Sequence, residues 1–123
     1  MRRSEFRNAA LAVVLMAAGA AHGQTGDAAK GADAYDDRCS GCHVMGGIGQ
    51  GPNLAGVVGR KAGATPGFGY TAALKGSGLT WTPANLERWL AGPQKLVPGT
   101  AMTAVVPDAV ERRELIAYLA TLK

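Results

Sequence analysis

Apolar residues recur at helical spacing in three stretches of the chain, and no window alternates with the period of two that marks a half-buried strand. The first stretch begins after a capping residue, Thr25 or Asp27, and ends at a pair of cysteines. Its apolar stripe consists of Ala28, Ala32, Tyr35 and Cys39. We therefore expect a first helix that leads directly into the cysteine pair.

Two further helices are marked by residues that begin and end helices. The capping and stop signals are Thr82-Pro83 and Gly92-Pro93 for one helix, and the capping-box pair Asp108 and Glu111 for the last one. Their apolar faces are Leu86, Trp89 and Leu90 in the first case, and Leu115, Leu119 and Leu122 in the second. Both faces have the spacing of amphipathic helices that pack on one core.

Long irregular segments separate these helices. The 123 residues include 18 glycines and 6 prolines, and only 6% of all residues are aromatic. The run from 44 to 54 holds four glycines and cannot form a helix or a regular strand. One or two helical turns are expected from Thr71 to Lys75, where Gly76 stops them. We predict a single all-α domain of at least three helices, whose long loops wrap something or carry function.

The N-terminal residues have the pattern of a secretory signal peptide. Arg2, Arg3 and Arg7 precede an apolar run of 13 residues, and small residues flank a cleavage position after Gly23. The run is shorter than the ~20 apolar residues that a membrane-spanning helix needs. We predict a signal peptide over 1–23 and a domain over 24–123 in the periplasm. The alternatives are an uncleaved membrane anchor, a twin-arginine signal and a buried N-terminal helix.

The charge of the chain gives little support to nucleic-acid binding. Without residues 1–23 the chain has ten basic and eight acidic residues, a net charge of +2. The basic pairs Arg60-Lys61 and Arg112-Arg113 are isolated and lack interleaved aromatic residues. We therefore expect no nucleic-acid partner.

The chemistry is concentrated in Cys39-Ser40-Gly41-Cys42-His43, the C-x-x-C-H pattern of c-type haem attachment. The spacing matches two thiols to the two vinyl groups of the porphyrin and puts the histidine under the iron. A disulfide across so small a loop gains little stabilisation. A zinc site lacks a fourth ligand once 1–23 is removed, and a thioredoxin-like pair lacks its strand. We expect one covalent haem c, with His43 as the proximal iron ligand.

The second axial position of the iron has few candidate ligands. No second histidine remains after removal of 1–23, and Met45 lies too close to His43 to reach the opposite face. Met102 follows Pro98-Gly99 in a stretch too broken for a helix. An isolated methionine more often packs in a core, but Met102 is the remaining strong-field ligand. We predict that it is the distal ligand, in a loop that little else holds.

Further motifs accompany the haem motif in an order that resembles the class I cytochromes c, close to the mitochondrial and small bacterial soluble types. The matching residues are Gly31, Tyr35, Gly51-Pro52-Asn53-Leu54, Gly59-Arg60-Lys61, 66–70, Leu79-Thr80-Trp81, 98–102 and 114–119. The resemblance covers nearly all of residues 27–123. It implies the class I cytochrome c fold, with helices and long loops around one covalent haem and with Gly31 at a close crossing of the first and last helices.

The same resemblance implies roles for residues outside the haem motif. The carbonyl of Pro52 would hold the His43 imidazole in place. Arg60, Tyr70 and Trp81 would be partners of the haem propionates, although Trp81 also suits a plain core position.

Some positions depart from the family pattern. Trp89 stands where a tyrosine commonly approaches the methionine sulfur. Ala101 and Ala104 replace a lysine and an aromatic residue beside the exposed haem edge. Of the lysines that ring this edge in the mitochondrial type, the chain keeps positive charge at Arg38 and Lys95. The surface for partners therefore differs from the mitochondrial one.

The predicted function is a one-electron carrier of the periplasm that cycles haem iron between Fe(III) and Fe(II). We expect a monomer that exchanges electrons with donor and acceptor redox complexes, without a small-molecule substrate and without enzymatic activity. One alternative is a dedicated cytochrome c subunit of a periplasmic dehydrogenase. Another is a gas-binding or peroxidatic haem protein, which requires Met102 to be absent or labile.

Overall fold

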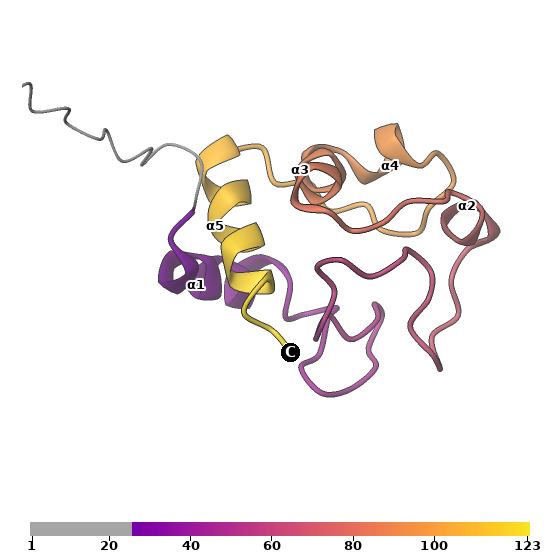
Figure 1. Ribbon diagram of the computed structural model, residues 1–123, viewed down its shortest axis with the longest axis horizontal. Coiled ribbons are helices and arrows are strands. Elements are labelled where there is room, and N and C mark those ends of the chain that lie inside the picture. The colour runs from indigo at the N-terminus through magenta and orange to yellow at the C-terminus, as the bar shows by residue number, and fades with distance from the viewer. Residues whose placement is uncertain (1–25) are drawn as a thin grey trace, which may run out of the picture.

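Four helices begin where the sequence predicts them in the computed structural model, which describes residues 26–123, and a fifth is an addition. The helices are α1 (Ala28–Arg38), α2 (Ala72–Lys75), α3 (Pro83–Ala91), α4 (Pro93–Leu96) and α5 (Ala109–Leu119) (Figure 1). Four of them start at an N-cap whose side chain accepts backbone N–H groups of the first turn: Asp27, Thr71, Thr82 and Asp108. The described residues form no strand beyond a single antiparallel bridge between Lys61 and Thr80, so the all-α prediction is confirmed.

The segment after α3 is more regular than predicted. Gly92 ends α3, as expected, but it also precedes the additional helical turn α4. Pro93 is accommodated there because the first position of a helix needs no backbone N–H donor. The capping box at Asp108 is only half formed, because the Glu111 carboxylate pairs with Arg38 of α1 at 2.5 Å instead.

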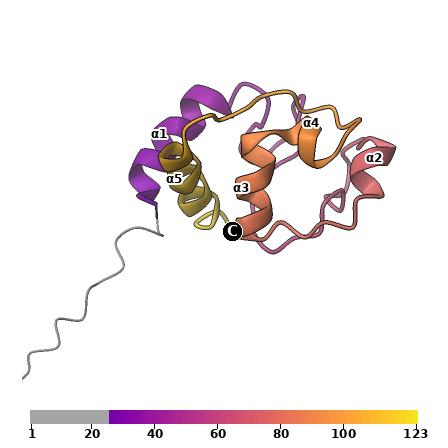
Figure 2. The ribbon, with the colours of Figure 1, turned by 90° about the horizontal axis from the view of Figure 1, so that it is seen from above.

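The crossing of α1 and α5 decides which face of α1 is buried. A Cβ at Gly31 would overlap the carbonyl oxygen of Glu114 in α5, so only glycine allows this approach. Next to it, the rings of Tyr35 and Tyr118 pack with their centroids 5.4 Å apart. Figure 2 shows the two helices side by side. The buried face of α1 is therefore rotated from the predicted stripe, whose first two alanines are only half-buried.

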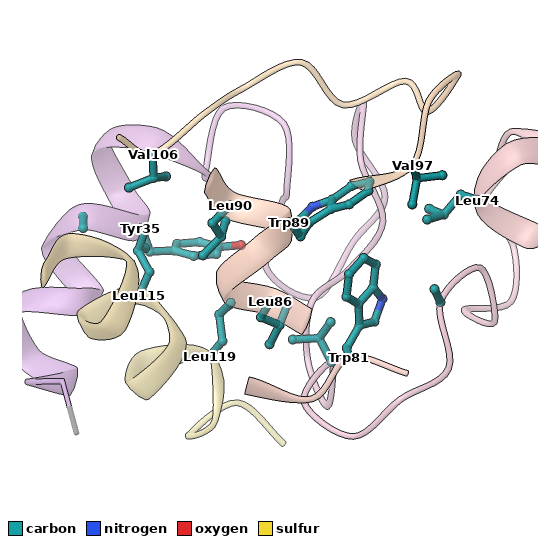
Figure 3. Packing of buried hydrophobic residues seen from close by; sticks show 13 residues of the cluster. Tyr35, Leu74, Trp81, Leu86, Trp89, Leu90, Val97, Val106, Leu115 and Leu119 are labelled. Atoms are coloured by element: carbon teal, nitrogen blue, oxygen red, sulfur yellow. The ribbon is translucent and has the colours of Figure 1, made fainter. Parts of the chain in front are cut away.

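One hydrophobic core extends from this crossing through α3 to the loops beyond it (Figure 3). Its members are Ala34, Tyr35, Val57, Ala62, Leu74, Trp81, Leu86, Trp89, Leu90, Val97, Val106, Leu115 and Leu119. Arg112 ties α5 to α3 through an ion pair with Glu87 at 2.6 Å. The predicted stripe residue Leu122 lies beyond the end of α5 but still packs against the core.

The predicted signal peptide over 1–23 lies outside the described residues and stays a prediction. None of the helices within 26–123 has the length and apolar character to cross a membrane.

Candidate functional site

A cavity of about 270 Å³ lies among α1, α3, α5 and the long loops. All eight residues that the sequence analysis assigned to the site line it: Cys39, Cys42, His43, Pro52, Arg60, Tyr70, Trp81 and Met102. Much of the remaining wall is aliphatic, with Leu54, Leu74, Leu86, Leu90, Leu115 and Leu119. An apolar cavity of about 150 Å³ can remain dry and bind an apolar ligand, so this larger one is suited to a bulky apolar group.

The turn after α1 brings both cysteines to this cavity. Cys39 is the C-cap of α1, and its carbonyl accepts the backbone N–H of Cys42 at 3.1 Å and of His43 at 2.8 Å. Both thiols are free, so they form no disulfide with each other. Burial raises the pKa of the Cys39 thiol to about 11, and it is therefore protonated at neutral pH. Cys42 lies in the exposed rim.

Two neighbours set the orientation of the His43 imidazole. Its Nδ1 lies 2.8 Å from the carbonyl oxygen of Pro52, the contact that the resemblance implied. Because a carbonyl only accepts, Nδ1 carries the proton and Nε2 keeps its lone pair for a metal. Gly51 packs on the ring: a Cβ there would lie 2.5 Å from the imidazole Cε1 atom. The Gly-Pro pair therefore fixes both the position and the tautomer of the ring.

Tyr35 has a role at the site that the sequence analysis missed. Its hydroxyl donates a 2.6 Å hydrogen bond to the backbone carbonyl of His43, eight residues along the chain. Burial is the main reason why the pKa of Tyr35 rises to about 12, with smaller contributions from Cys39, Tyr118 and Asp36. The buried hydroxyl thus remains a donor and ties the haem motif to α1.

Met102 lies on the loop between α4 and α5 and is held more firmly than predicted. The indole N–H of Trp89 donates to the Met102 sulfur at 3.2 Å. The amide Nε2 of Gln94 donates to the carbonyls of Thr100 and Met102, at 2.5 and 3.2 Å. Thr100 itself is buried. The expectation of a loop with few other contacts is therefore wrong, because side chains of α3 and α4 fix it.

The three implied propionate partners bring hydrogen-bond donors to the same cavity. Arg60 is half-buried, and its guanidinium donates to the carbonyls of Ala55 at 2.9 Å and Asn53 at 3.1 Å, which hold it in place. Tyr70 adds a phenolic O–H and Trp81 an indole N–H. The ring of Trp81 packs edge-on against that of Trp89, with centroids 5.0 Å apart (Figure 3).

These residues fit a haem group. Two thiols, an imidazole with a free Nε2 atom and a thioether sulfur reach one apolar cavity, and imidazole with thioether is the axial set of haem iron in c-type cytochromes. Within residues 26–123, no group of three or more His, Cys, Asp or Glu side chains is placed to hold a metal ion.

Comparisons with known proteins agree with this site. The family model of cytochrome c matches residues 28–123. Cytochrome c of Tetrahymena pyriformis is 47% identical over 96 residues, which cover 76% of this chain and 87% of that protein. Cytochrome c2 of Rhodopila globiformis is 44% identical over 101 residues, or 80% of this chain and 95% of that protein. The solved structure of cytochrome cH from Methylobacterium extorquens matches with a TM-score of 0.75 and 48% identity, covering 78% of this chain and 99% of that one.

The fold and the site thus define a c-type haem protein of the class I cytochrome c fold. The chain belongs to the cytochrome c family. It binds one haem c, attached covalently through Cys39 and Cys42. Members of this family are electron carriers rather than enzymes, and the chain is an electron carrier in this general sense.

Proposed function

We propose that the chain is a one-electron carrier of the periplasm, in which His43 and Met102 are the two axial ligands of the haem iron. One observation carries this proposal. A histidine ring oriented by Pro52 and a thioether sulfur oriented by Trp89 line the same apolar cavity, next to the two cysteines that attach the haem. The bound haem supplies the one-electron Fe(III)/Fe(II) couple.

The chain's own residues would hold the two iron ligands in one orientation in both oxidation states. The His43 imidazole donates to the Pro52 carbonyl, and the Trp89 indole donates to the Met102 thioether, so neither ligand would have to be reoriented when the iron changes charge. The leucines of the wall keep water out of the cavity. Arg60, Tyr70 and Trp81 would offer donors to the propionate carboxylates, which would otherwise be costly to bury.

This ligand set favours a carrier over a gas-binding or peroxidatic haem protein. With His43 and Met102 both bound to the iron, no coordination position would be left open, and Trp89 and Gln94 restrain the loop that bears Met102. Access of a small molecule to the iron would require this loop to open first. The contacts of the loop therefore support the carrier, which would serve donor and acceptor redox complexes as a monomer.

The ligand assignment can be tested on the oxidised haem protein by its near-infrared band from sulfur to iron. We expect the band at pH 7, and we expect Met102→Ala to abolish it and to let the reduced protein bind carbon monoxide. Met45→Ala is the matched control, because Met45 is 48% exposed and should leave the band unchanged. A band that persists in Met102→Ala, or that is missing from the unmodified protein, would overturn the assignment.

Export and processing form the other part of the proposal. The pattern of residues 1–23 supports a signal peptide that is removed after Gly23, which leaves a domain over 24–123. The intact mass of protein from the periplasm should equal residues 24–123 plus one haem. Protein found only in membranes, with residues 1–23 still attached, would show an anchor instead.

A further inference from the structure

The exposed rim of the haem cavity has almost no net charge. Seven of the residues that line the cavity are exposed: Arg38, Cys42, Gln50, Gly69, Ala101, Thr103 and Ala104. Arg38 is the one charged residue among these seven, and its guanidinium pairs with the Glu111 carboxylate at 2.5 Å. The other charged residue of the wall, Arg60, is half-buried and bonded to backbone carbonyls. The rim thus presents neither a basic nor an acidic face.

Exposed apolar side chains are neighbours of the rim residues along the chain in two places. Val105 follows Ala104 along the chain and is 46% exposed. The loop between the rim residues Cys42 and Gln50 turns back on itself, where the Gly51 N–H donates to the Cys42 carbonyl at 2.9 Å. Its side chains of Val44, Met45 and Ile48 are all exposed. Three exposed apolar side chains on one short loop beside a cavity mouth are consistent with an interaction site.

The cavity mouth is where a partner can come closest to the haem, because the rest of the wall is covered by helices and loops. Electron exchange requires close approach, so the rim has to be part of any contact surface. Protein interfaces have few charged residues at their centre. A charged partner surface would lose its hydration here without gaining an opposite charge.

We propose that the chain exchanges electrons through this uncharged rim, and that the rim fits a redox partner whose own contact surface is uncharged and apolar. The inference rests on the proposed carrier function and adds the chemistry of the partner. It predicts that docking does not depend on an acidic partner surface, because Arg38 is paired with Glu111 and Lys95, although exposed, does not line the cavity. Association would therefore lack long-range electrostatic steering and depend little on salt.

A second copy of the chain is a suitable probe, because it presents the same rim. Electron self-exchange between oxidised and reduced haem protein can be measured from the broadening of NMR lines in mixtures. The Debye length falls from about 30 Å at ~10 mM salt to about 3 Å at ~1 M salt. We expect the self-exchange rate to change by less than about twofold over this range, since no rim charge is left to screen.

Added charge on the rim should create the missing salt dependence. Ala104→Lys places one positive charge on the rim of each of the two copies. If these two charges lie about 8 Å apart in the contact, their repulsion should slow self-exchange two- to fivefold at low salt. High salt should screen the repulsion and restore the rate. Ala104→Gln controls for side-chain size and should show the weak salt dependence of the unmodified protein. Ala84→Lys controls for net charge, because Ala84 is an exposed residue in the first turn of α3 and does not line the cavity.

Two results would overturn the inference. One is a strong salt dependence of self-exchange in the unmodified protein, which would show that charges govern the contact. The other is an equal response of Ala104→Lys and Ala84→Lys, which would mean that the rim is not the contact surface. In both cases the protein still exchanges electrons, so the proposed carrier function survives. A protein without reversible one-electron chemistry would instead refute the carrier function itself.

Discussion

Removal of the haem should unfold this domain, and the size of the cavity gives the magnitude. The change is Cys39→Ser together with Cys42→Ser, studied without haem. The cavity of about 270 Å³ would then be left unfilled. At about 24 cal/mol per Å³ of cavity, this costs about 6 kcal/mol. Small domains have a total free energy of unfolding of about 5–15 kcal/mol, so the cost of the empty cavity is comparable to the whole stability of the domain.

The assay is far-ultraviolet circular dichroism of the haem-free double variant during heating. We expect weak helical signal at room temperature and no cooperative transition. Addition of haem to the same variant is the control, because non-covalent haem refills the cavity without restoring the cysteines. Recovery of a cooperative transition would show that filling of the cavity stabilises the fold. A cooperative transition in the haem-free variant would refute the reasoning, since the core would then be independent of the cofactor.

Three further predictions concern single contacts in the haem protein. Trp89→Phe removes the donor to the Met102 sulfur, which should lower the free energy of loop opening by about 0.5–1.5 kcal/mol. In a denaturant titration of this variant, the sulfur-to-iron band should therefore disappear at a lower denaturant concentration than the helical signal. Equal shifts of the two midpoints would contradict this prediction. Gly31→Ala should cost about 1–3 kcal/mol in chemical unfolding, because α1 must move off α5, whereas the control Gly41→Ala meets no atom within 4 Å and should change little. Tyr35→Phe should be less stable at neutral pH by about 1 kcal/mol. Folding raises the pKa of Tyr35 from 10.0 to about 12, so the unmodified protein loses stability as the pH rises from 10 to 12. The difference in free energy of unfolding between the unmodified protein and Tyr35→Phe should therefore shrink over this pH range. A difference that stays constant would contradict the raised pKa.

The helix boundaries could be predicted because they depend on local chemistry. Asp27, Thr82 and Asp108 accept N–H groups only two or three residues away, so the sequence alone contains both partners. The turn α4 is not predicted, because Gly92-Pro93 marks the end of α3, although a proline also suits the first position of a helix. The buried face of α1 could not be predicted from periodicity, because it depends on how closely α5 approaches Gly31.

The chemistry of the site was predictable in its residues and less so in its contacts. C-x-x-C-H and the shortage of other ligands indicated His43 and Met102 directly from the sequence. The Pro52 contact came from resemblance to a family. The donors that fix the Met102 loop, Trp89 and Gln94, come from other helices, and nothing in local spacing says that they meet it. The resemblance places Trp89 near the methionine sulfur, but the indole donor bond and both Gln94 bonds depend on how α3 and α4 pack against the loop.

We propose that this chain holds one haem as a reversible one-electron carrier, with His43 and Met102 on the iron. The most direct measurement is a spectroelectrochemical titration of the purified haem protein at pH 7, with and without carbon monoxide. We predict a single reversible wave with the slope of one electron, unchanged by carbon monoxide. A wave that carbon monoxide shifts, or a slope that differs from one electron, would contradict the account.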